Sequence, residues 1–151
     1  MKPILSLLLV GMLPSTQTGQ AGSPQNNPPG VPSPQLAEFD YKLKCQGCHR
    51  KDGSGDDHTN PPMNGAVAKF LQVEGGREFL IQVPGVATAD LDSERLAALV
   101  NWTLYRFDPL HLPEGFQPYA ASEVESLRQN PLRLERAAKR EQLMIAINKL
   151  K

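Results

Sequence analysis

The chain has 151 residues and a formal net charge of zero, with 16 basic and 16 acidic side chains. This balance argues against binding to nucleic acid, because no strongly basic surface with interleaved aromatic residues is present. Only 6% of the residues are aromatic. We therefore expect a small domain with a modest side-chain core, to which a large apolar cofactor would add buried surface.

The N-terminus has the pattern of a cleavable secretory signal peptide over residues 1–21. Lys2 provides the positive charge, residues 4–13 form an apolar stretch too short to span a membrane, and Ala21 is a small residue at the cleavage site. Residues 22–35 are rich in proline and polar side chains, and we expect a disordered linker there because they bury little apolar surface. The predicted location is the bacterial periplasm, without a stable membrane span.

The segment 45–49, Cys-Gln-Gly-Cys-His, contains the only two cysteines of the chain. At this spacing, two thiols form thioether bonds to the vinyl groups of haem, and the adjacent imidazole binds the iron. A redox dithiol, or a zinc site that adds two of His49, His58 and His111, is the alternative. Haem is favoured because no βαβ pattern is visible and because haem is attached to such motifs outside the cytoplasm.

Helices are predicted on both sides of this segment. Ser33 and Pro34 have the character of an N-cap and a first helical residue, and the helix continues to Lys44. Ala37, Tyr41 and Cys45 lie four residues apart and so share one face. Further helices are expected over residues 66–71, over 77–83 before Pro84 and Gly85, and from the N-cap Asp92 to Phe107.

Together these residues resemble the class I monohaem c-type cytochromes. In that family, a small residue and an aromatic residue precede the first cysteine as Ala37 and Tyr41 do, and the first and last helices cross at an aromatic contact, here through Trp102. The resemblance covers about residues 36–107. It implies an all-α fold, a bundle of about four short helices around one covalent haem c.

The remaining residues extend beyond the family pattern. We divide the chain into a signal peptide (1–21), a linker (22–35), a cytochrome c domain (36–108) and a helical C-terminal extension (109–151). Within the extension, Ser122 and Glu125 form a capping box that predicts a short helix, and a longer helix is predicted from Pro131 to Leu150.

The family resemblance also implies how the iron is held. His49 would be the proximal ligand, and the carbonyl of Pro61 would accept the proton on its Nδ1 atom. Most class I members supply a methionine as sixth ligand from the loop before the last helix, but here that loop, residues 83–91, has no methionine, histidine or lysine. Met63 and His111 are the candidates for the sixth ligand, and a five-coordinate or water-bound iron is the alternative.

The implied function is periplasmic electron transfer, either as a soluble carrier or as the small haem subunit of a dehydrogenase or oxidase chain. The expected partner is then a periplasmic redox protein, and the chain is not itself expected to be an enzyme, so no catalytic residue is assigned. The loop without a methionine keeps a second function open, a haem-based module that binds or senses a small ligand at an open iron site.

Overall fold

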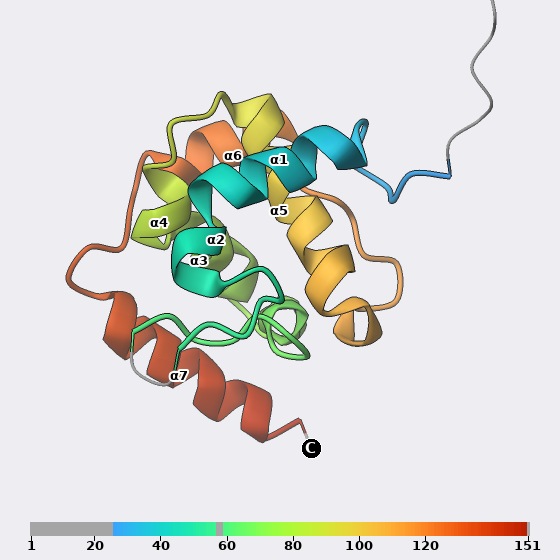
Figure 1. Ribbon diagram of the computed structural model, residues 1–151. Coiled ribbons are helices and arrows are strands. Elements are labelled where there is room, and N and C mark those ends of the chain that lie inside the picture. Colours follow the sequence, from blue (N-terminus) through green and yellow to red (C-terminus); the bar gives the residue numbers. More distant parts are fainter. Residues whose placement is uncertain (1–25, 57–58, 151) are drawn as a thin grey trace, which may run out of the picture.

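The computed structural model describes residues 26–56 and 59–150, so the predicted signal peptide and His58 lie outside the described residues. Within these two ranges the secondary structure is entirely helical and contains no strand (Figure 1). The predicted all-α class is thus confirmed. None of the helices in these two ranges has the length and apolar character needed to cross a membrane.

The first helix, α1 (Pro34–Lys44), begins as predicted. The hydroxyl of Ser33 accepts a hydrogen bond from the backbone N–H of Leu36, and Pro34 occupies the first turn, where its missing N–H costs nothing. Ala37 and Tyr41 are buried against the rest of the fold. The Tyr41 and Trp102 rings lie 5.4 Å apart between their centroids, which confirms the predicted aromatic contact between the first and last body helices.

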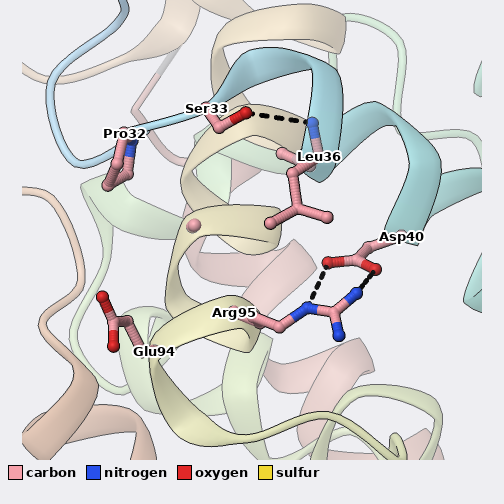
Figure 2. Close-up of a pocket in the computed structure, with 8 residues that line it drawn as sticks. Pro32, Ser33, Leu36, Asp40, Glu94 and Arg95 are labelled. Carbon is pink, nitrogen blue, oxygen red and sulfur yellow. Dashed lines mark hydrogen bonds and ion pairs between the residues drawn. The ribbon is translucent and has the colours of Figure 1, made fainter.

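The central helix is α5 (Ser93–Phe107), which has α1 on one side and α6 (Ala121–Arg128) on another (Figure 1). It begins at Asp92, whose side chain accepts a hydrogen bond from the N–H of Arg95. An ion pair joins α5 to α1, because the guanidinium of Arg95 reaches both carboxylate oxygens of Asp40 (Figure 2). Asp40 is only 1% exposed whereas the Arg95 side chain is 39% exposed, so Arg95 gives the buried carboxylate a charged partner where the two helices meet.

The segment between the motif and α5 folds into three short elements: η1 (Val67–Gln72), α3 (Gly76–Gln82) and α4 (Pro84–Ala87). The first is a 3₁₀ helix. The helix α3 ends before Pro84, as predicted, and Pro84 then occupies the first turn of the next helix, α4, a position where proline is well tolerated. The rings of Phe70 and Phe79 stack at 5.2 Å and join η1 to α3.

The C-terminal part contains η2 (Pro109–His111), α6 and α7 (Arg136–Asn148). The predicted capping box is wrong: α6 starts after Ala120, and Glu125 accepts a hydrogen bond from the Ser93 hydroxyl instead of capping its own helix. The last helix also starts later than the predicted Pro131. The backbone N–H of Leu132 donates to the carbonyl of Gln82 (2.9 Å), which holds this stretch as a connector.

Two apolar clusters are present. The main core combines α1 and α5 with residues from the C-terminal part, including Tyr119 (3% exposed) and Val124 (0% exposed). A smaller cluster joins Phe70 and Phe79 to Leu143 and Ile147 of α7. Residues beyond 108 thus share the main core, and the proposed boundary between body and extension stays a prediction.

The described part of the predicted linker is packed on the body, which differs from the disorder expected there. A turn from Pro28 to Val31 brings Val31 into the structure, where it is 2% exposed. The side-chain amide of Asn101 donates to the carbonyl of Gly30 at 3.1 Å. The Val31 side chain and the Gly30 carbonyl connect this stretch to the body. The amino-acid composition of the segment does not reveal such individual contacts.

Candidate haem site

The motif residues lie on one helical turn. Cys45 ends α1, and its N–H donates to the Tyr41 carbonyl at 2.9 Å. The next element, α2 (Gln46–His49), is a single turn in which the N–H groups of Cys48 and His49 both donate to the Cys45 carbonyl. Both thiols are free, with Cys45 half-buried and Cys48 exposed. The two thiols and the imidazole are therefore presented by one compact segment.

The chain leaves this turn in a fixed direction. The hydroxyl of Tyr41 donates to the carbonyl of Arg50 at 2.6 Å, and Arg50 has a positive φ of 61°. Gly53 follows with φ of 74° and lies directly on the Phe107 ring, where a Cβ atom would come within 2.6 Å of the ring. Only glycine fits this close approach, so the loop is held against α5 and His49 is held with it.

His49 carries the one buried side-chain nitrogen or oxygen atom that has no hydrogen-bond partner among the described residues, its Nδ1. Burial lowers the pKa of His49, while the Pro61 carbonyl and Asp56 raise it less strongly. The Pro61 carbonyl is thus close to the ring, although it does not form a hydrogen bond of normal geometry with Nδ1. A neutral imidazole with a backbone carbonyl nearby suits a metal-bound histidine, and the role of Pro61 stays a prediction.

The Cys45 thiol differs from the reactive thiol of a redox dithiol. Burial, and to a smaller extent the charges of Asp40 and Cys48, raise the pKa of Cys45 to about 11. A catalytic dithiol needs a lowered pKa, since the thiolate is the reactive form. In the part of the chain that the structure covers, no three histidine, cysteine or acidic side chains gather into a metal site. The arrangement fits thioether attachment better than exchange chemistry.

The two candidates for the sixth iron ligand lie in different surroundings. Met63 is half-buried against the main core, which Cys45 also contacts, and its N–H donates to the Gly53 carbonyl at 2.8 Å. His111 is bound through Nδ1 to the buried carboxylate of Asp108 and lies beside η1 and the end of α7. Met63 is thus tied by its backbone to the loop that follows the motif, whereas His111 lies among other elements.

One residue near the site was missed by the sequence analysis. Arg128, the last residue of α6, donates hydrogen bonds to three carbonyls in the loop between α4 and α5. No local pattern marks it, because an arginine at the end of a helix is common and its acceptors lie about 40 residues earlier in the chain.

Comparison with known proteins connects this geometry to a family. The chain is 34% identical over 107 residues to cytochrome c-552 of Thermus thermophilus, which covers 59% of this chain and 82% of that protein. A second cytochrome c-552, from T. thermophilus strain ATCC 27634, shows the same identity and is covered over 72% of its length. No family model matches the chain, and no solved structure matches it.

An all-α body with two cysteines and a histidine on one turn defines a c-type cytochrome with a single attachment motif. Taken with the cytochrome c-552 relatives, these features show that the chain belongs to the class I monohaem c-type cytochromes. It carries haem c, and its function is electron transfer by that haem. The predicted family, fold class and cofactor are confirmed.

Proposed function

We propose that Cys45 and Cys48 hold the haem through two thioether bonds and that His49 binds the iron from the proximal side. The observation that carries this assignment is the buried Nδ1 atom of His49, on the turn that also presents both thiols. The carbonyl of Pro61 lies close to the imidazole and is the acceptor that we assign to the proton on Nδ1. Pro61 thereby orients the ring.

The chain then acts in periplasmic electron transfer, as a soluble carrier or as the small haem subunit of a dehydrogenase or oxidase chain. Haem c supplies a one-electron iron couple when it is bound. Cys48, which is exposed, would hold the group at the surface, where a periplasmic redox partner can reach it, and Cys45 would hold it against the core. The partner is a periplasmic dehydrogenase or oxidase.

The attachment is tested by producing the full chain with a haem-maturation system outside the cytoplasm. Wild-type protein is expected to keep haem on a denaturing gel, and the double variant Cys45→Ala, Cys48→Ala is expected to lose it. Gln46→Ala, on the same turn, is the matched control and should keep haem. Normal covalent haem in the double variant would contradict the assignment.

A second candidate function is binding or sensing of a small ligand at an open iron site. It is favoured by the loop 83–91, which offers no methionine, histidine or lysine as a sixth ligand. Optical spectra of ferric and ferrous protein separate the two functions. A low-spin spectrum that changes in Met63→Ala or in His111→Ala supports the carrier and identifies the ligand, whereas a high-spin spectrum with rapid carbon monoxide uptake supports ligand binding.

A further inference from the structure

Arg128 ties the C-terminal part of the chain to the loop between α4 and α5. Its Nε donates to the carbonyl of Ala87 at 3.1 Å, one terminal nitrogen donates to Ala89 at 2.5 Å, and the other donates to Leu91 at 2.7 Å. One half-buried guanidinium therefore serves three backbone acceptors in a stretch of five residues.

These carbonyls lie at the end of helix α4 and in the irregular segment that follows it. The helix α4 ends at Ala87 and α5 begins at Ser93, so the carbonyls between them have few backbone partners. The loop itself contributes short-range bonds only, from Ala89 to the Val86 carbonyl and from Leu91 to the Ala89 carbonyl. The planar fork of an arginine can reach several acceptors at once, which a single ammonium group cannot do.

The same loop reaches the end of α1, which leads into the motif. Val86, Ala89 and Leu91 pack against the main core that Cys45 also contacts. The carboxylate of Asp90 is 3.9 Å from the ammonium of Lys44, the residue just before Cys45. This exposed ion pair contributes little energy, but it shows that Asp90 of the loop lies within reach of the end of α1, one residue before the motif.

Arg128 is carried by a firmly anchored helix. Val124 of α6 is fully buried in the main core. Glu123 receives two hydrogen bonds from the guanidinium of Arg77 at 2.6 and 2.7 Å, and these bonds join α6 to α3. Glu125 accepts a hydrogen bond from Ser93 at the start of α5. Contacts of α6 with α3 and α5 thus determine where the Arg128 side chain lies. Arg128 in turn holds the loop through its hydrogen bonds.

We propose that Arg128 is a positioning residue of the haem site, which holds the loop 87–91 closed beside the haem and limits the access of water and small ligands to it. This inference rests on the haem attachment proposed above. A looser loop admits water, which stabilises the more highly charged ferric form, so the reduction potential falls when Arg128 is lost. Access for an external ligand increases at the same time.

The test compares wild-type, Arg128→Gln and Arg128→Lys proteins, each as the full chain with covalent haem. We expect carbon monoxide to bind ferrous Arg128→Gln about tenfold faster than wild type, the size of an ordinary coupling between two sites, and the reduction potential to be lower. Arg128→Lys keeps the charge but reaches fewer carbonyls, so it should lie between the two. It also keeps the test informative if the glutamine variant does not fold.

Two controls separate this role from general loosening. Leu143→Ala, in the separate small cluster that α7 forms with Phe70 and Phe79, weakens the fold away from α6, so it should lower the denaturation midpoint and leave carbon monoxide binding unchanged. Arg136→Gln, at an exposed position in α7, should change neither quantity. Wild-type binding rates and potentials in both Arg128 variants would overturn the proposal, and so would an equal rate increase in Leu143→Ala.

Failure of the underlying assignment has a different signature. A wild-type chain that carries no covalent haem after maturation overturns the proposed attachment, and this inference with it. A wild-type chain with haem, together with Arg128 variants that behave as wild type, overturns only the role of Arg128.

Discussion

The two long helices after residue 120 are attached to the protein in different ways. α6 places Val124 in the main core and is joined to α3 by Arg77 and Glu123 and to the loop before α5 by Arg128. α7 buries Leu143 and Ile147 against a separate small cluster, and its first half is largely exposed. In Figure 1, α7 lies along the outer edge of the molecule, whereas α6 lies behind α1.

This difference indicates that the C-terminal part does not behave as one unit. α6 shares apolar and polar contacts with the elements around the motif, so its stability is coupled to that of the body. α7 is held mainly by a few apolar side chains, and such elements open at a lower free energy than the rest of a protein. Four measurements, taken from the largest expected effect to the smallest, test this distinction.

The largest effect is expected from Val124→Asp, which places a carboxylate in the main core without a partner. We expect the free energy of unfolding to fall by about 3 kcal/mol or more, because a buried unpaired charge is costly. The control is Ile145→Asp in α7, where the side chain is 52% exposed and the change should stay within about 0.5 kcal/mol. Chemical denaturation measures both, and equal losses would contradict the distinction.

A smaller and local effect is expected from Leu143→Ala in α7. The side chain is 2% exposed, so the cavity costs about 2–3 kcal/mol. If α7 opens independently, this cost appears as faster hydrogen exchange of α7 amides, while the amides of α5 keep their protection. Leu104→Ala, in α5, is the comparison and should accelerate exchange throughout. Uniform acceleration in Leu143→Ala would show that α7 is part of the cooperative body.

We expect alkaline pH to lower the stability of the region around α6, because the hydroxyl of Tyr119 loses its proton there. Burial raises the pKa of Tyr119, whose hydroxyl donates to the Arg77 carbonyl at 2.8 Å. The folded state therefore holds this proton more tightly than the unfolded state, so the contribution is complete below the ordinary tyrosine pKa of about 10 and is lost as pH rises above it.

The expected slope for this one group is at most about 1.4 kcal/mol per pH unit. Thermal melts followed by circular dichroism between neutral and alkaline pH measure it, and Tyr119→Phe should be less sensitive to pH than wild type. Identical pH dependence in the two proteins would show that Tyr119 does not contribute to the alkaline loss.

The smallest effect is expected from new helix caps. Ala120 precedes α6 in an extended conformation (φ −90°, ψ 154°), so Ala120→Ser can cap the helix and should stabilise the whole protein by about 0.5–1 kcal/mol. Glu135 precedes α7 in a helical conformation (φ −81°, ψ −10°), which does not suit a capping side chain. Glu135→Ser should therefore give no gain, and a gain equal to that of Ala120→Ser in the denaturation midpoint would contradict this reasoning.

Predictions from local sequence patterns were correct where the interactions that determine the structure are themselves local. The start of α1 at Ser33 and that of α5 at Asp92 were predicted from capping residues, and both caps are present. The capping box at Ser122 was wrong because Glu125 has a better partner in Ser93, which lies 32 residues earlier. The packing of residues 30 and 31 on the body was missed for the same reason, since the Gly30 carbonyl is bound by Asn101, 71 residues later.

By itself, the sequence determined the class of cofactor, the family and the helical fold. The spacing of Cys45, Cys48 and His49 is set by covalent chemistry that acts within one turn, so it can be recognised without coordinates. Only the tertiary structure decided that α6 belongs to the main core, that α7 packs on a separate cluster, and that Arg128 holds the loop between α4 and α5. Those features depend on contacts between residues far apart in the chain, which no local pattern encodes.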